Sequence, residues 1–574
     1  MRALPFLGSF VALIIGATSI LAEEAAVVHD AEYYILEAQN GKVWEVEDGE
    51  LDKKLAELKE KYGTTPNLIH LMWDDQPFGA VGIPAMQQLR GFETPNLNQM
   101  ASEGLLFTRM YTEPSCTPTR AAAWTGQYAI RSGMYSVGFP VEYEGFAAEN
   151  ITIAEVLSDA GYSTGFFGKL HLGDIEETYP HNQGYDEAFT ALYNQAVSLW
   201  NTQAEAANAV VGLKSELLAE NRYQKDETFV RDGYVFYIEG EKGGPTREWC
   251  GIEAECYRKF DIEARDRTFD FITRNAEAGK PFYAAWWPLW TSFLPEAPKE
   301  TLQRGLVAES YHKYLDPDVG QLMALLHDLG IAENTLVIAM SDNGPMTHNP
   351  PAGAGLGEGP FRGGKGDYLE GGVRVSAQAW WPGMIEGGRI AGDIVHVTDL
   401  FTTFARLAGA LDHVPTDRVI DGVDQTSLLL NGDGFSRRDN VMIYSGPVLG
   451  ASVKDHYKTH WLSSSTQALG GLTSVYDLYN DHREENPIVV GGFHFKEPFR
   501  RMRARHEMWI QKYPHIPRAH GPAYGGIENA RPETVALSEA PEALKNLPFG
   551  MLDYIEQLPN LPFDPSGDVG IGGN

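Results

Sequence analysis

Cysteine is scarce in this chain of 574 residues, which contains Cys116, Cys250 and Cys256 and no others. So few cysteines exclude a small fold held together mainly by disulfides. Cys250 and Cys256 flank the short stretch CGIEAEC, so they could close a small disulfide loop, or they could be two unrelated thiols, because geometry cannot be read from spacing. In either case Cys116 has no partner.

Basic residues are also few, with 46 Lys and Arg against 78 Asp and Glu, and the formal net charge is -32. A field of this sign repels the phosphate backbone, which excludes nucleic acid as an expected partner. It repels anionic substrates in general as well. An enzyme that acts on such substrates would therefore need a local cluster of cations.

Long hydrophobic runs are missing after the N-terminus, so no later segment is expected to span a bilayer. At the N-terminus, Arg2 precedes an apolar stretch from about Leu4 to Ile15, and small residues follow up to Ala22. This layout predicts a secretory signal peptide over residues 1–22 and export to the periplasm or the extracellular space. A membrane anchor is the alternative, but the stretch is short for one, and Gly and Ser residues dilute it.

The remaining chain is apolar enough, at 43% overall, to bury a large core. Residues 23–65 are polar and predict a helical extension before the main fold. Over residues 66–440, short apolar runs such as NLIHLMW and NTLVIAMS alternate with helix-like stretches such as TIAEVLSDAG. This alternation predicts an α/β fold with a large, mostly parallel or mixed central sheet flanked by helices. Over residues 441–574, YKTHWL and TSVYDLY predict a smaller C-terminal domain with an antiparallel sheet, followed by a surface tail.

Polar residues follow several predicted strands, at the edge where open α/β sheets bind their ligands. Asp74 and Asp75 come directly after NLIHLMW, and Asp342 and Asn343 come after NTLVIAM. Their carboxylate and amide oxygens suit a hard cation such as Ca²⁺ or Mg²⁺. A helix cap or a turn would explain the first pair alone, but the second pair at another strand end favours a metal site.

The unpartnered Cys116 stands in PSCTPTRAAAWTGQY, at the start of a predicted helix. Thr117 can cap this helix, Pro118 suits its first position and Gly126 can end it. The N–H groups at such a helix start favour an anion, and Arg120 in the first turn can point toward the same anion. A buried structural cysteine is one alternative, and a thiolate nucleophile with a distant histidine is another.

Several of these segments resemble one enzyme family. CTPTR at residues 116–120 matches the sulfatase signature Cys-x-Pro-x-Arg, in which the cysteine is oxidised to formylglycine after synthesis. Further motifs of this family are resembled, between residue 67 and about 374, by GFFGKLHLG, SDNG and FRGGKGDYLEGGVRV. A weaker resemblance beyond them is found in VYDLYNDHREENP. The chain is therefore similar to the formylglycine-dependent, arylsulfatase-like sulfatases. The resemblance implies an alkaline phosphatase-like fold and hydrolysis of sulfate esters.

The resemblance also implies a role for each matching residue. A single divalent metal ion, Ca²⁺ in preference to Mg²⁺, would be bound by Asp74, Asp75, Asp342, Asn343 and the formylglycine made from Cys116. The formylglycine hydrate would be held by Arg120 and Lys169, with His171 as its base. The substrate sulfate would be contacted by Lys169 and Lys365.

The chemistry implied by the family uses a hydrated aldehyde, which carries two hydroxyl groups on one carbon. One hydroxyl, made more acidic by the metal, attacks sulfur and expels the alcohol. The other loses its proton to His171, and the hemiacetal collapses to release sulfate. Metal, Arg120, Lys169 and Lys365 would stabilise the transferred group, and they would form a cationic pocket inside an acidic protein.

One position departs from the family pattern. The family usually has a histidine after a strand of the KPFYAAWW type, whereas Ser292 stands near that position here. Either Lys365 alone assists the leaving group or another residue does. His348 is a candidate for this substrate-binding role, although an ordinary loop histidine would explain it as well. Because phenols leave with little help from an acid, the missing histidine favours aryl sulfates as substrates. Nearby tryptophans are expected in the core, with a wall of the substrate pocket as the alternative: Trp286, Trp287 and Trp290.

Two other functions remain open on the sequence. Related enzymes with the same fold and formylglycine hydrolyse phosphonate monoesters or phosphodiesters. A non-catalytic binder of sulfated glycans would instead be expected to have lost metal ligands or Arg120, and none is lost. The expected partners are a small-molecule or glycan sulfate ester and, during maturation, a formylglycine-generating enzyme, with no nucleic acid and no stable membrane anchor.

Overall fold

The computed structural model describes residues 26–194, 233–251, 254–289, 309–346, 359–462, 474–488, 490–513 and 515–538. The predicted signal peptide (1–22) and most of the predicted surface tail (539–574) lie outside these residues. Within them, every helix is too short or too polar to cross a bilayer.

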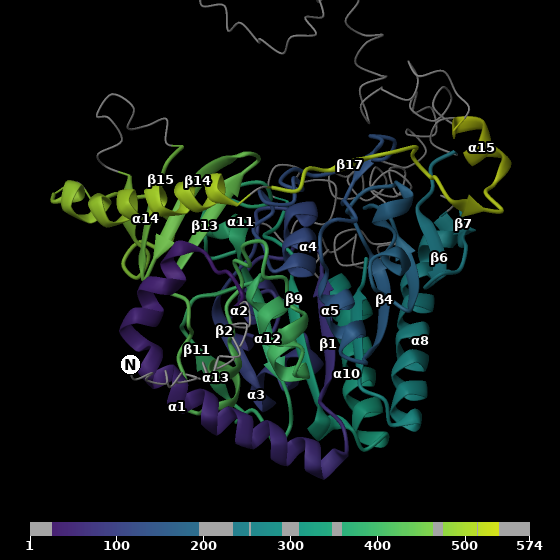
Figure 1. The fold of residues 1–574 in the computed structure, drawn as a ribbon, viewed down its shortest axis with the longest axis horizontal. Helices are drawn as coiled ribbons and strands as arrows, with labels where there is room; N and C mark the ends of the chain where they lie inside the picture. The colour runs from purple at the N-terminus through teal and green to yellow at the C-terminus, as the bar shows by residue number, and fades with distance from the viewer. Residues whose placement is uncertain are drawn as a thin grey trace, which may run out of the picture.

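A twelve-stranded mixed sheet forms the centre of the molecule (Figure 1). Its middle strands are parallel, in the order β9 (Thr335–Ser341), β1 (Asn67–Trp73), β8 (Phe282–Trp287), β4 (Ser163–Lys169) and β5 (Glu187–Ala191). Beyond β9 lie β10 (Arg374–Trp380), antiparallel to β9, then β2 (Leu105–Tyr111), β11 (Arg389–Ala391) and β12 (Val395–His396). Beyond β5 lie β6 (Tyr237–Glu241), β7 (Thr246–Cys250) and β18 (Ile527–Glu528). The predicted large sheet is confirmed.

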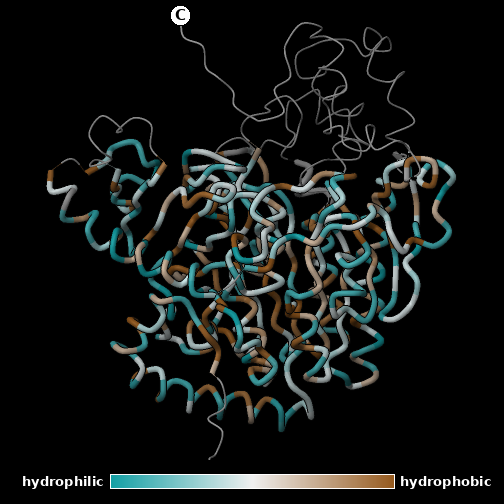
Figure 2. The backbone as a smooth tube through the Cα atoms, turned by 45° about the horizontal axis from the view of Figure 1, so that its top comes forward, coloured by the Kyte–Doolittle hydropathy of each residue, from teal (hydrophilic) through white to brown (hydrophobic). Residues whose placement is uncertain are grey.

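The middle strands are rich in apolar residues because both faces of the sheet are covered. Every residue of β1, β8 and β9 is buried. Figure 2 shows hydrophobic segments concentrated in the interior and hydrophilic segments along the outside. Strands β1 and β9 pair in register up to Trp73 and Ser341, so their carboxyl ends stop side by side. The residues that follow these two strands are therefore neighbours.

Two groups of helices flank this sheet. In the first group, α8 (Ala254–Ala278), α10 (Glu309–Asp328) and α3 (Pro95–Glu103) pack in series. In the second, α12 (Asp399–Ala408) contacts α4 (Cys116–Thr125), α5 (Ile153–Asp159) and α13 (Thr426–Leu430). Three further short helices are α2 (Pro84–Arg90), α11 (Glu370–Val373) and α15 (Pro532–Ser538).

The N-terminal extension is a single helix, α1 (Ala31–Tyr62), which runs along the lower edge of the view in Figure 1. Asp30 caps its start by accepting a hydrogen bond from the N–H of Ala31, and Gly63 ends it with a φ of 75°. The helix packs against α13 and against α14 (Gly492–Lys512), so it joins the large domain to the C-terminal part.

A second, four-stranded antiparallel sheet lies to one side of the large one. It consists of β13 (Asn440–Ser445), β14 (Val448–Lys454), β15 (Tyr457–His460) and β16 (Val475–Asp477). This confirms the small antiparallel sheet expected from YKTHWL and TSVYDLY. After α14 the chain returns to the large domain, where β17 (Ala519–His520) pairs with β3 (Glu144–Gly145) and β18 pairs with β7.

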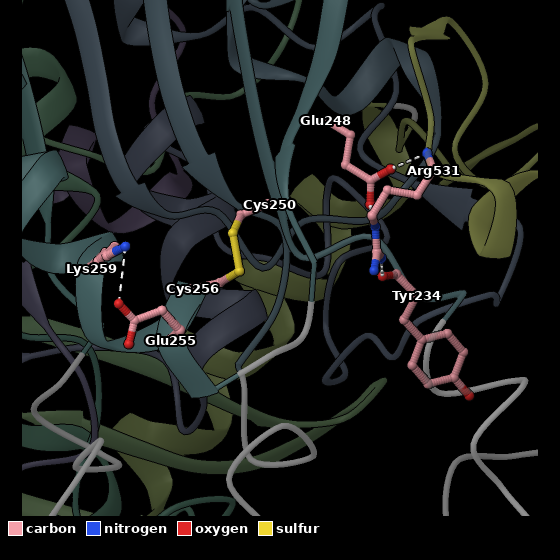
Figure 3. The surroundings of a disulfide bond; sticks show 7 residues. All are labelled: Tyr234, Glu248, Cys250, Glu255, Cys256, Lys259 and Arg531. Carbon is pink, nitrogen blue, oxygen red and sulfur yellow. Dashed lines mark hydrogen bonds and ion pairs between the residues drawn. A yellow bond between two sulfur atoms is a disulfide. The ribbon is translucent and has the colours of Figure 1, made fainter.

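Cys250, at the end of β7, and Cys256, near the start of α8, form a disulfide (Figure 3). Of the two readings left open by the sequence, the structure therefore contains the bonded pair. Beside it, Glu248 of β7 pairs with Arg531 at 2.7 Å, which anchors the segment leading into α15. The remaining cysteine, Cys116, is buried and outside any disulfide.

Candidate active site

The acidic residues predicted to bind metal meet at the carboxyl ends of β1 and β9. The N–H of Asp342 donates to the carbonyl of Trp73 at 2.8 Å, and the N–H of Asp75 donates to Oδ1 of Asp342 at 3.0 Å. Nδ2 of Asn343 donates to Oδ1 of Asp75 at 2.7 Å. Asp75 has a φ of 55°, an unusual conformation for a residue other than glycine. These backbone and side-chain bonds bring the two predicted pairs into one cluster.

Cys116 is the first residue of α4, so the helix begins earlier than the sequence predicted. Ser115 occupies the N-cap position without a side-chain hydrogen bond, whereas Thr117 was expected there and Pro118 at the first helical position. Thr117 does not cap because its hydroxyl donates to the carbonyl of His171 at 2.8 Å and accepts from the N–H of Gly138 at 3.1 Å. The expected end of the helix at Gly126 is confirmed, with a φ of 67°.

Arg120, one turn into α4, joins this helix to the acidic cluster. Its guanidinium pairs with Asp74, donates to Oδ2 of Asp342 at 3.1 Å and donates to the carbonyl of Lys169 at 2.7 Å. The ring of Trp287 lies 5.0 Å from its Cζ. This Arg is fully buried, so each contact fixes it within the site.

Two lysines complete the positive charge of the site. Lys169 ends β4 and pairs with Asp74. Nζ of Lys365 lies 2.8 and 3.0 Å from the two oxygens of Asp75 and 2.8 Å from Sγ of Cys116. The structure thus brings together all the predicted metal, nucleophile and cationic residues in the part of the chain that it describes.

His171 follows β4 and lies against the loop that contains Gly138. Its Nε2 lies 3.0 Å from the carbonyl oxygen of Gly138, which can only accept, so Nε2 carries the hydrogen and Nδ1 is left as an acceptor. Nδ1 is buried and has no hydrogen-bond partner in the described structure. Burial, with Lys169 and Lys365 adding to it, lowers the pKa of His171 well below its usual value, so the ring is neutral at neutral pH.

The buried charges also shift the pKa values of the other groups. Burial alone would raise the pKa of Asp74, but Lys169 and Arg120 outweigh it and hold that pKa well below its usual range. Burial makes the largest contribution to raising the pKa of the Cys116 thiol, and the negative charges of Asp342 and Asp75 raise that pKa further. The thiol is therefore protonated at neutral pH and is a weak nucleophile in its unmodified form.

The donor set fits a hard divalent cation. Asp74, Cys116 and Asp342 can each offer one ligand atom, and these atoms lie within 4.8 Å of one another. Oδ1 of Asn343 is buried with no hydrogen-bond partner in the described residues, so it has a free lone pair for an ion. Apart from Sγ of Cys116 these donors are oxygens, and oxygen donors suit Ca²⁺ or Mg²⁺ rather than a thiolate-seeking metal.

Some predicted residues lie outside the described residues, among them His348, Ser292 and Trp290. Trp286 and Trp287 are buried at 1% and 0% exposure, which confirms the expected core position. Gly138 was not predicted, although its carbonyl orients His171. A residue that acts through its backbone leaves no side-chain signature in a sequence, so only the fold could identify it.

Three cations beside a buried cluster of carboxylates, at the carboxyl edge of this mixed sheet, suit a hydrolase of anionic esters. A family model described as Sulfatase matches residues 66–410. N-acetylgalactosamine-6-sulfatase of Canis lupus familiaris is 34% identical over 423 residues, which cover 71% of this chain and 74% of that protein. Arylsulfatase A of Homo sapiens is 34% identical over 460 residues, covering 74% and 84%.

A solved structure agrees with these relatives. The crystal structure of PsFucS1 sulfatase from Pseudoalteromonas sp. matches with a TM-score of 0.71 and 30% identity, over 82% of this chain and 96% of that one. The chain belongs to the sulfatase family, and it is a hydrolase of sulfate esters. This sets aside the non-catalytic binder as a description of the chain.

Proposed function

We propose that the chain hydrolyses sulfate esters with a formylglycine made from Cys116 and one divalent metal ion, Ca²⁺ in preference to Mg²⁺. The observation that carries this proposal is the surroundings of Cys116. Its Sγ is buried 2.8 Å from Nζ of Lys365, and it shares a ligand-sized cluster with Asp74 and Asp342. The raised pKa of the thiol makes an unmodified cysteine a poor nucleophile there, whereas a formylglycine hydrate would supply hydroxyl groups at the same place.

The ion would be held by Asp74, Asp75, Asp342 and Asn343. When bound, it supplies positive charge that makes a neighbouring hydroxyl more acidic and stabilises developing negative charge. Arg120 and Lys169 orient the carboxylates and the modified residue, and Lys365 reaches the place where a sulfate group would lie. Donors fixed before the reaction stabilise charge in the transition state at no cost of reorganisation.

His171 would accept a proton through Nδ1. Its neutral ring and its Nε2 bond to Gly138 support this assignment, because they leave the lone pair of Nδ1 available. With Nε2 already bound to a carbonyl, the ring cannot turn without losing that hydrogen bond. The hydrogen bond from Nε2 to Gly138 therefore determines both which nitrogen of His171 can accept a proton and how the ring is oriented.

The first test of the proposal is the mass of the tryptic peptide that contains Cys116, from protein made in its native host. A mass corresponding to formylglycine supports the proposal, and an alkylatable cysteine in active enzyme contradicts it. Cys116→Ala is the matched variant and should lose activity. Chelation followed by Ca²⁺ or Mg²⁺ addition identifies the metal, and failure of both to restore activity would argue against the assigned ligands.

The leaving group is proposed to be a phenol, because Ser292 stands near the position of the family histidine and a phenol leaves with little help from an acid. A sulfated amino sugar is the second candidate, because several relatives are named N-acetylgalactosamine-6-sulfatase. Comparing kcat/KM on p-nitrophenyl sulfate and on N-acetylgalactosamine 6-sulfate separates the two. A second series of aryl sulfates with different leaving-group pKa values tests for an acid: a flat dependence would mean that one is present.

Export is proposed as well, with removal of residues 1–22 and maturation of Cys116 by a formylglycine-generating enzyme before folding. Burial of Cys116 supports this order, because a thiol with no exposure in the folded chain is beyond the reach of another enzyme. N-terminal sequencing of the mature protein should begin at Glu23. A mature chain that retains Met1 would contradict cleavage.

A further inference from the structure

Three charged residues of the C-terminal part and of α11 form a cluster with no exposure to solvent. Nζ of Lys458, on β15, lies 3.1 Å from Oε1 of Glu370 and 3.0 Å from Oε1 of Glu484. Oε2 of Glu484 accepts the N–H of Glu370 at 2.8 Å, and Oε1 accepts from His460 at 2.7 Å. Glu484 belongs to VYDLYNDHREENP, the sequence motif to which the catalytic site gives no role.

The cluster is held in a fixed geometry. Glu484 has a φ of 56°, a strained conformation that persists only where several contacts determine it. Burial would raise the pKa of Glu484, but Lys458 outweighs it and lowers that pKa to about 2, so the carboxylate is charged. The other oxygen of Glu370 accepts from Tyr111 at 2.9 Å and from Arg374 at 3.3 Å. Buried charges with all partners present are costly to displace.

Glu370 lies five positions after Lys365, and the residues that flank this segment pack backbone against backbone, with the N–H of Gly371 donating to the carbonyl of Arg362 at 2.9 Å. A Cβ on Gly371 would fall 2.3 Å from the carbonyl oxygen of Gly363, and one on Gly344 would fall 1.8 Å from that of Gly371. No side chain could fit at these positions, so the glycines are required by close approach. Displacing Glu370 would therefore displace the Lys365 loop, defined here as residues 362–369.

The Lys365 loop is also bonded to both halves of the catalytic site. The N–H of Lys365 donates to the carbonyl of Pro345 at 2.8 Å, just past Asn343. The N–H of Gly366 donates to the carbonyl of Pro114 at 2.6 Å, two residues before Cys116. The Lys365 loop thus lies between the SDNG segment and the start of α4. The charged cluster holds Glu370, the residue that directly follows the loop.

We propose that Glu484 and Lys458 are positioning residues for sulfate-ester hydrolysis: through Glu370 they fix the Lys365 loop, so the small C-terminal sheet determines where Nζ of Lys365 lies. This inference rests on the proposed function, in which Lys365 contacts the sulfate. It gives the C-terminal sheet a part in catalysis without any contact with the substrate.

A double-mutant cycle on the full-length enzyme tests this, with rates normalised to formylglycine content. Glu484→Gln keeps the shape of the side chain but removes its charge and replaces one of its two acceptor oxygens with an NH2 donor. We expect it to lower kcat/KM by about tenfold in the native background and by less than about twofold in the Lys365→Ala background, because both changes then affect the same group. The fall in Tm caused by Glu484→Gln should be equal in the two backgrounds, because the cluster stabilises the fold whether or not residue 365 is a lysine.

Equal losses of kcat/KM in both backgrounds would overturn the inference, because the cluster would then act on the fold or on another group. The single variant Lys365→Ala tests the proposed function by itself. Wild-type activity of this variant would refute the role of Lys365 in contacting the sulfate. If Glu484→Gln does not fold, Tyr111→Phe removes the hydroxyl that donates to Glu370 at 2.9 Å and that also contacts Arg109, and its smaller loss should likewise disappear in Lys365→Ala. Asp316→Asn is the matched control, because Asp316 is a buried carboxylate that accepts from Asn96 and Leu97, far along the chain from the loop. It should lower Tm and leave kcat/KM unchanged.

Discussion

At the residue scale, burial changes the chemistry of individual groups in opposite directions. It keeps the thiol of Cys116 protonated and the imidazole of His171 neutral. For Asp74 the neighbouring cations outweigh burial, so the carboxylate stays charged. Burial at one site is therefore compatible with a charged carboxylate and a neutral imidazole, and the difference comes from which partners each group meets.

His171 gives the first prediction. Its pKa lies below the ordinary histidine value of 6.5, so the ring remains an unprotonated base as the pH falls through that value. The pH profile of kcat should show no histidine-like inflection near 6.5, and the loss of the base should begin only at more acidic pH. His171→Ala should lower kcat by roughly a hundredfold or more, with a smaller change in KM. A profile that bends near pH 6.5 in the native enzyme would contradict the neutral, buried base.

Glu113 gives a prediction on stability. Burial raises its pKa to about 8, and its Oε1 accepts from the N–H of Ala129 at 3.0 Å. Because the folded pKa lies above the unfolded one, the native state holds a proton that the unfolded state releases, and stability falls as the pH rises from about 4.5 through 8. Glu113→Gln should match the native enzyme at pH 5 and exceed it at pH 9, by up to roughly 4 kcal/mol. Denaturant unfolding at the two pH values measures this, and equal stability of the two proteins at pH 9 would mean that folding does not raise the pKa of Glu113.

At the element scale, the sequence predicted the central strands well because burial on both faces forces continuous apolar runs. NLIHLMW and NTLVIAMS are such runs, and the in-register ends of β1 and β9 then bring Asp74 and Asp342 together. The start of α4 was predicted less well, because the hydroxyl of Thr117 binds His171, which is distant in the sequence. Strands β13 and β14 were not identified from the sequence, since both are buried and lack the alternation that marks a half-exposed strand.

The N-terminal cap of helix α5 allows a test of how much a short sequence motif contributes to stability. Oγ1 of Thr152 accepts the N–H of Glu155 at 3.1 Å, and the carboxylate of Glu155 accepts the N–H of Thr152 at 2.7 Å, which forms a reciprocal capping box. Thr152→Ala should lower the free energy of unfolding by about 1 to 2 kcal/mol with little effect on kcat. Thr152→Ser should retain most of it in urea unfolding. If the serine variant loses as much as the alanine variant, packing of the threonine methyl group rather than the cap supplies the stability.

At the scale of the whole molecule, the acidic surface and the cationic site act against each other on an anionic substrate. The chain has a formal net charge of -32, while Arg120, Lys169 and Lys365 lie together at the active site. These three cations are already paired with buried carboxylates. Their charge is therefore largely compensated at a distance, and the acidic exterior determines the field that an approaching sulfate ester meets.

The approach of a sulfate ester should consequently become easier as salt screens the protein. The screening length falls from about 30 Å at roughly 0.01 M salt to about 8 Å at roughly 0.15 M, so repulsion from distant surface carboxylates is removed while contacts inside the site are hardly affected. We expect kcat/KM to rise over this range in sodium chloride, and kcat to stay constant, because kcat is measured with substrate already bound. Sulfate salts must be avoided, since the product ion would compete for the site. A fall of kcat/KM with salt would mean that the cations of the site attract the substrate over a long range and that their pairing with carboxylates does not hide them from solvent.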